Sequence, residues 1–284
     1  MVFLFGIAEV YHWPCMVSGL ESAKLKLVRA SEHLSTINRV IAGITSRTDS
    51  YEIIKDANGK ETVNFLVGPP PEIAILAGEI VYHLRSAIDH LAFDLVKLNP
   101  TKASLPAHWF KSCDFPLWLT IPDHLIKSGH TNPPLPYNCF AKRLPGISRA
   151  AFAFIESVQP YRSGTGTHSV MRLIAQLSNA DKHRHPNVTL PRVALHQNLK
   201  LTGGRVFTLS RGGFKDGAEI DSPSVVTADD IVGVQRTFLP YVTFAEPTVG
   251  TGPDTLEVQH VLQVCLEQIE TVIIPAFAQL LRNP

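Results

Sequence analysis

Arginine and histidine stand five positions apart in the segment 79–94, which reads EIVYHLRSAIDHLAFD. The guanidinium of Arg85 has a planar donor fork that suits a phosphate, and the imidazole of His90 can exchange protons near neutral pH. Asp89 lies four residues after Arg85, within reach of an ion pair on one helical face. These residue types suit a site in which Arg85 binds a phosphate and His90 acts as general acid or base, with Asp89 beside them.

A helical wheel divides the polar side chains of this segment into two flanks. Imidazoles and carboxylates share one flank, namely Glu79, His83, His90 and Asp94. Arg85 falls about 140° from His90 at 100° per residue, so one chain would aim the two groups poorly at a single phosphate. A homodimer could combine them from two chains.

Two other interpretations of the same helix stay open. The flank of imidazoles and carboxylates could hold a metal ion, as helical bundles do, although the second Glu-x-x-His helix of such sites is missing. Alternatively, the polar face is simply solvated, and Arg85 and Asp89 form a surface salt bridge that contributes little to stability.

A second polar cluster, SNADKHRH, occupies residues 178–185 at the end of a predicted helix. Basic groups at this place would complement the helix dipole. A functional interpretation is that the cluster adds phosphate-binding charge next to His90. The candidate binding residues are Asn179, Asp181, Lys182, His183 and Arg184, together with His33 of the first predicted helix, which could face His83.

Two long helices must position these groups. Apolar residues recur every three or four positions over 19–46 and again over 72–98, which predicts amphipathic helices that pack lengthwise. Between them, residues 50–67 carry β-branched runs around Asn58-Gly59 and predict a hairpin. The two helices should therefore lie antiparallel. Asp94 occupies a seam position where an apolar residue is expected.

The remaining chain predicts shorter helices over 146–158 and 168–182, strand-like segments over 187–246 and a last helix over 255–282. Pro275 should kink this last helix. The expected fold class is α+β, a bundle of long antiparallel helices with a small hairpin and an inserted antiparallel β region. We expect a loose arm over 1–17 and one domain over 18–284, with the bundle at 18–186 and 255–284 and the β insert at 187–250.

The composition of the 284 residues excludes several classes of protein. Hydrophobic residues make up 45%, and 26 basic residues nearly balance 25 acidic ones, which excludes a disordered chain. A net charge of +1 gives no general attraction to nucleic acid or membrane, so RNA or a small anionic ligand would need a local patch. Four scattered cysteines are typical of free thiols in a cytoplasmic protein. We expect no signal peptide, no membrane-spanning segment and no cofactor.

Three motifs carry a resemblance to a known family. LRSAIDHLA at 84–92, RASEHL at 29–34 and LSNADKHR at 177–184 resemble a family of uncharacterised bacterial proteins with "LRSALDHLA" and "LSNxDKHR" motifs. This resemblance covers about residues 20–190 and implies the same order of helix, hairpin and helix, in a bacterial cytoplasm. It implies no reaction.

The spacing of Arg85 and His90 also resembles the R-x-x-x-x-H motif of HEPN-type nucleases, helical bundles that are often dimeric and cleave RNA without metal. That resemblance implies an RNA phosphodiesterase in which Arg85 and His90 polarise the phosphate and manage the proton of the 2′-hydroxyl. The β insert and Ser86 depart from the HEPN pattern. The alternatives are a non-catalytic cytoplasmic binding module with a polar His/Arg/Asp pocket and a metal-binding helical bundle.

Overall fold

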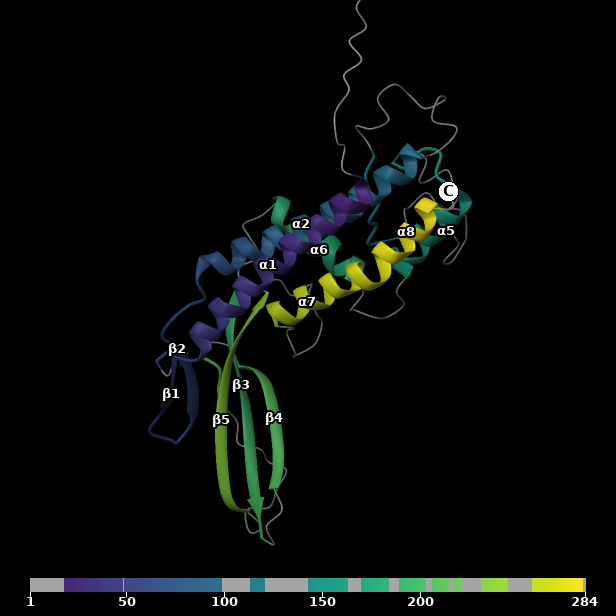
Figure 1. Ribbon diagram of the computed structural model, residues 1–284. Helices are drawn as coiled ribbons and strands as arrows, with labels where there is room; N and C mark the ends of the chain where they lie inside the picture. The colour runs from purple at the N-terminus through teal and green to yellow at the C-terminus, as the bar shows by residue number, and fades with distance from the viewer. Residues whose placement is uncertain are drawn as a thin grey trace, which may run out of the picture.

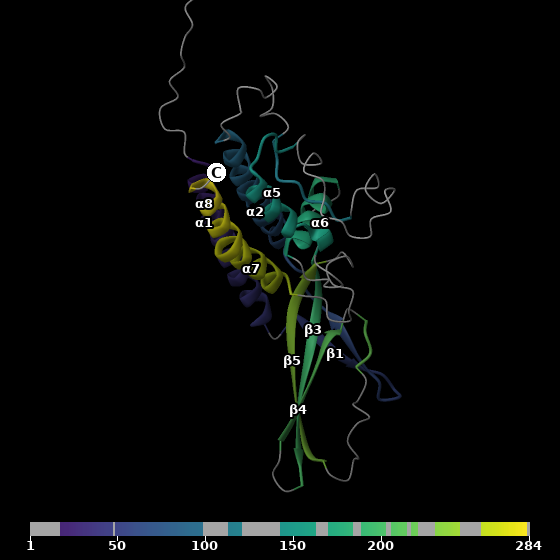
Figure 2. The ribbon, with the colours of Figure 1, turned by 90° about the vertical axis from the view of Figure 1, so that its right-hand side faces the viewer.

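The computed structural model combines helices with antiparallel strands, which confirms the α+β class. The structure describes residues 18–47, 49–98, 113–120, 143–162, 170–183, 189–202, 206–214, 217–220, 231–244 and 257–282. The helices lie side by side, and a long three-stranded sheet extends away from them (Figure 1, Figure 2). The predicted arm over 1–17, most of 99–145 and Arg184 lie outside the described residues.

The two long helices predicted from the apolar repeats are confirmed. Helix α1 spans Gly19–Thr45 and helix α2 spans Pro71–Lys97. Ser18 caps α1 by accepting a hydrogen bond from the backbone N–H of Glu21. The helices lie antiparallel, since the start of α1 meets the end of α2. Their apolar stripes enter the main core, where each fully buried Leu or Ile contributes roughly 1.5–3 kcal/mol.

A hydrogen bond made by Asp94 explains why a polar residue occupies the apolar seam of α2. Its carboxylate accepts a hydrogen bond from the backbone N–H of Gly19, with 2.5 Å between N and Oδ2. One of the N–H groups that a helix start leaves unpaired is thereby satisfied by the neighbouring helix. The approach is so close that a Cβ on Gly19 would lie 2.3 Å from the carbonyl oxygen of His90 and 2.6 Å from the Asp94 carboxyl carbon.

The predicted hairpin is present as β1 (Tyr51–Lys55) and β2 (Glu61–Phe65). Gly59 adopts a positive φ of 82° in its turn, the conformation that favours glycine. Residues 217–220 lie along β2, because the backbone of Val63 exchanges hydrogen bonds with Ala218 and Gly217. Val63 also belongs to a second, small core with Leu195 and Ile220.

The large sheet has longer strands than the sequence suggests. It consists of β3 (Thr189–Leu201), β4 (Val206–Phe214) and β5 (Ile231–Phe244), in the antiparallel order β4-β3-β5. Strand β3 runs without a break through the polar residues 196–198, which pair with both neighbouring strands. Pro191 is tolerated in the central strand because the pairing with β4 begins only at Val193.

Three shorter elements follow the hairpin and α2. They are α5 (Arg149–Ser157), the 3₁₀ turn η3 (Pro160–Arg162) and α6 (Val170–His183). Helix α6 packs against α2 and places Leu173, Ile174 and Leu177 in the main core.

The last helix is interrupted where Pro275 predicts a kink. It runs as α7 (Val258–Gln268), a π turn at Ile269–Ile273 and α8 (Ile274–Arg282). The N–H of Ile274 donates to the carbonyl of Ile269, five residues back, because proline lacks an N–H and crowds the preceding turn. The helix packs on both α1 and α2, as expected from its apolar stripe.

One described helix is long and apolar enough to cross a membrane by length and composition alone, so the absence of a membrane-spanning segment stays a prediction. The 25 residues Val258–Arg282 form a helix with a mean hydropathy of 1.5 over an 18-residue window. In the structure 44% of that window is buried, and Val261, Leu262 and Phe277 belong to the main core. The core helix of a folded domain passes the same test.

Replacing Gly19 with alanine should destabilise the protein by about 1–3 kcal/mol, because the new Cβ would overlap the backbone of His90. Urea unfolding measures this change. Gly43→Ala is the matched control in the same helix: nothing lies within 4 Å of its Cβ position, so we expect stabilisation of up to about 1 kcal/mol. Equal effects of the two substitutions would contradict the close contact.

Candidate functional site

A polar seam runs along the solvent side of the contact between α1 and α2. We use this name for Ser22, Lys26 and His33 of α1 together with Glu79, His83, Ser86 and His90 of α2. The α1 members are separated by four and seven residues, which places them on one flank of that helix. Antiparallel packing then sets this flank against the flank of α2 that carries the imidazoles.

His90 is held at one end of the polar seam by two hydroxyl groups. Its Nδ1 lies 2.8 Å from Ser22 Oγ, and its Nε2 lies 3.4 Å from Ser86 Oγ. Partial burial lowers the pKa of His90 below its ordinary value of 6.5, and the nearby charge of Lys26 lowers it further, against the opposing effect of Asp89 and Asp94. The imidazole is therefore neutral at pH 7.

His33 and His83 form a stacked pair at the other end of the polar seam. Their ring centroids are 5.6 Å apart and their planes differ by 12°. Nε2 of His33 lies 3.4 Å from a Glu79 carboxylate oxygen, whereas Nδ1 of His83 is buried without a hydrogen-bond partner. The expectation that His33 faces His83 is confirmed.

The pKa of His83 is also lowered from 6.5. Burial is the largest cause, followed by the charges of Lys26 and His33, and Arg29 acts in the same direction. Glu79 opposes them. The polar seam thus carries two imidazoles that are neutral at pH 7 and one ammonium that acts on both.

Arg85 and Asp89 lie on a different flank of α2 and hold a returning segment of chain, residues 113–120. Asp89 accepts from the backbone N–H of Phe115 at 2.8 Å, and Arg85 donates to the Phe115 carbonyl at 2.5 Å. Arg85 also lies 3.1 Å from an Asp89 oxygen. Their side chains are only 16% and 28% exposed, so this clamp is more than a solvated surface pair.

Burial raises the pKa values of two groups at this contact between Arg85, Asp89 and the 113–120 segment. Burial raises the pKa of Asp89, against the opposing effect of Arg85 and the Phe115 N–H. Burial, with the charges of Asp114 and Asp89, raises the pKa of Cys113 to about 12. Cys113 is therefore a protonated thiol at neutral pH and not a thiolate nucleophile.

The structure brings together only part of the predicted set. His33, His83 and Glu79 meet, whereas His90 contacts hydroxyls and Arg85 faces the 113–120 segment. Asn179 is exposed at the end of α6. The side chains of Asp181, Lys182 and His183, like Arg184, lie outside the described part of the structure. A cavity shared by all three motifs stays a prediction.

The alternative metal site is not assembled among the residues that the structure describes. Within them, no group of three or more His, Cys, Asp or Glu side chains has a geometry that could hold a metal ion. The four candidate ligands instead contact three different sets of partners along the helix. Glu79 and His83 contact His33, His90 bonds hydroxyls, and Asp94 caps α1.

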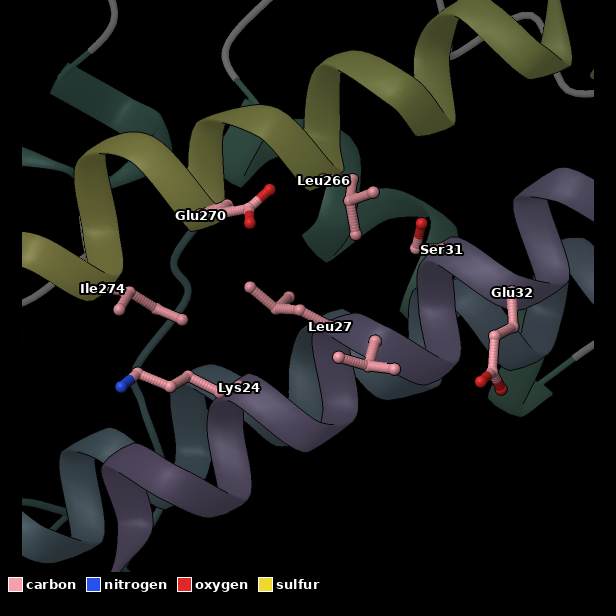
Figure 3. A pocket seen from close by; sticks show the side chains of 8 residues that line it. Lys24, Leu27, Ser31, Glu32, Leu266, Glu270 and Ile274 are labelled. Carbon is pink, nitrogen blue, oxygen red and sulfur yellow. The ribbon is translucent and has the colours of Figure 1, made fainter.

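A groove lies on the opposite side of α1, away from the polar seam. It has a volume of about 560 Å³ and separates α1 from the last helix (Figure 3). Its lining comprises Lys24, Leu27, Val28, Ser31, Glu32, Leu266, Glu270 and Ile274. None of the residues predicted from the motifs lines it.

The sequence motifs did not single out three members or neighbours of the site, namely Ser22, Lys26 and Tyr82. A signal for the first two exists in the sequence, because Ser22, Lys26, Arg29 and His33 repeat every three or four residues. That stripe borders the apolar seam of α1, where a partner helix must lie. The sequence around Phe115 has no periodic pattern from which its contact with Arg85 could be predicted.

Compared with protein-family models, with curated proteins and with solved structures, the chain matches none.

Removing the carboxylate of Asp89 should release the 113–120 segment. Asp89→Ala leaves the Phe115 N–H without its acceptor and Arg85 without its carboxylate, a loss of about 1–3 kcal/mol. Hydrogen exchange at the Phe115 amide should accelerate about tenfold or more. Glu32→Ala removes the exposed Arg29–Glu32 pair and should change stability by no more than about 0.5 kcal/mol. Unchanged exchange at Phe115 would argue against the clamp.

The two seam histidines should titrate below pH 6.5 when followed by NMR. The unfolded chain binds these protons more readily than the folded protein. The contribution of the two histidines to the free energy of unfolding is therefore fully present above pH 6.5 and is lost as the pH falls through the folded pKa values. Lys26→Met should raise the pKa of both imidazoles. Lys24→Met, which removes a lysine paired with Glu21, should leave them unchanged. A Lys26 variant without effect would show that the ammonium is not near them.

Proposed function

We propose that the polar seam binds the phosphodiester backbone of RNA and cleaves it without metal. One observation carries this proposal: the Lys26 ammonium acts on two imidazoles, His83 and His90, that burial keeps neutral at pH 7. A cation supplies charge for a phosphate, and neutral imidazoles can take and return protons.

The two histidines are seven residues apart on α2, which is about 10 Å along the helix axis. In the proposed reaction, His90 accepts the proton of a 2′-hydroxyl as its oxygen bonds to the adjacent phosphorus. The bond from phosphorus to the 5′-oxygen breaks, and a protonated His83 donates to that leaving oxygen. Lys26 stabilises the added negative charge on the phosphoryl oxygens.

Lys26 takes the role that the sequence motif suggests for Arg85. Nε and Nη2 of Arg85 already donate to Asp89 and to the Phe115 carbonyl, so a phosphate would compete with these partners. Its role as phosphate ligand stays a prediction, as do those of Lys182 and Arg184. The length and antiparallel packing of α1 and α2 support the expected bundle and the HEPN-like comparison.

The second candidate is a non-catalytic module that holds RNA or a small anion in the same seam. The observation that favours it is the orientation of His90, whose two ring nitrogens already contact Ser22 and Ser86. Such a histidine would position a ligand and leave its bonds intact.

The decisive assay is RNA cleavage in EDTA. The wild type should cut RNA, and DNA of the same sequence should stay intact because it lacks the 2′-hydroxyl. His90→Ala and Lys26→Ala should each lower the rate about 100-fold or more. The rate should be highest below pH 6.5, since both imidazoles have lowered pKa values and one must carry the proton.

Lys24→Ala, on the groove side of α1, is the matched control and should keep full activity. Circular dichroism and thermal unfolding verify that each variant is folded. RNA binding without cleavage would establish the binding module instead. If the folded wild type neither binds nor cleaves RNA, both the RNA phosphodiesterase and the RNA-binding module are refuted.

A further inference from the structure

Three rings lie in a row along the polar seam. The ring of Tyr82 meets that of His83 edge-on, with centroids 5.5 Å apart and planes inclined at 61°. His83 in turn stacks on His33 at 5.6 Å. We call Tyr82, His83 and His33 the ring row. It joins both long helices, because His33 belongs to α1 and the other two rings to α2.

Tyr82 is the exposed end of the ring row. The residue is 59% exposed, although burying an aromatic ring is one of the larger favourable terms in folding. It lies on the solvent side of α2, while the apolar stripe of that helix is fully used in the core. The packing of the described core therefore does not explain an aromatic side chain at this position.

A cation accompanies this exposed ring. Nζ of Lys26 lies 5.1 Å from the centroid of Tyr82, within the range of a cation–π contact. The same ammonium acts on His83 and His90. Tyr82 and the charge proposed to bind phosphate are thus part of one arrangement.

We infer that the Tyr82 ring is a stacking platform for an unpaired base, and that the RNA bound at the polar seam is single-stranded. This inference rests on the proposed function and names its substrate class. Proteins bind single strands by combining aromatic rings, on which bases stack, with cations that follow the phosphates. Lys26 has a long, flexible side chain that can move from the ring to the phosphate of the stacked nucleotide.

A duplex does not fit the same arrangement. In an A-form helix the bases are paired and stacked on each other, so their faces are not free to meet Tyr82. The exposed ring would then contribute no stacking energy. Discrimination between single-stranded and duplex RNA is therefore the property that Tyr82 should confer.

The test measures binding separately from cleavage. Fluorescein-labelled 2′-fluoro oligonucleotides lack the attacking hydroxyl, so fluorescence anisotropy with the full chain reports affinity for an uncut strand. The wild type should bind the single strand more tightly than the same strand in a duplex. Tyr82→Ala should weaken single-strand binding about tenfold, as expected for the loss of one stacked base. Tyr82→Phe keeps the ring and should bind like the wild type.

Ile75→Ala is the matched control, because Ile75 is 55% exposed on the same helix and carries no ring. It should leave both affinities unchanged. If the wild type binds single strands and Tyr82→Ala binds equally well, the stacking platform is refuted while the proposed function survives. Equal affinity of the wild type for the single strand and for the duplex would overturn the inference in the same way. If the wild type neither binds the oligonucleotides nor cleaves ordinary RNA, both proposals are wrong.

Discussion

The close antiparallel contact between α1 and α2 is the constraint on which the site depends. It is closest where the N–H of Gly19 meets the carboxylate of Asp94, since no side chain fits between the helices there. From that point both helices run about three to four turns before His33 and His83 meet. The register set at one end thus determines which imidazoles, hydroxyls and cations face each other along the rest of the seam.

The chemistry of the α2 helix follows from what packs on each flank. On the flank beside α1, partial burial and one ammonium keep two imidazoles neutral. On another flank, Arg85 and Asp89 are tied to the backbone of Phe115. Eight neighbouring positions of one helix, 83–90, therefore contain both a part suited to proton transfer and a part that holds the fold together.

Much of this arrangement could be predicted from the sequence, because it depends on periodicity. The apolar repeats identify α1 and α2, Asn58-Gly59 identifies the hairpin, and the wheel separates Arg85 from His90. The Gly19 partner of Asp94 and the Ser22 partner of His90 could not be predicted, because they depend on the register between helices that no repeat within one helix records. The segment of Phe115 lacks any period, so its return to α2 has no local signal.

The π turn in the last helix sets the phase of its apolar stripe. On a regular wheel, Ile273 and Phe277 would point about 60° and 100° away from the direction shared by Val258, Cys265 and Ile269. The extra residue accommodated between Ile269 and Ile273 offsets that drift, so buried side chains on both sides of it reach the same core. The helix would otherwise face the core with only one of its halves, and its other half would present apolar side chains to water.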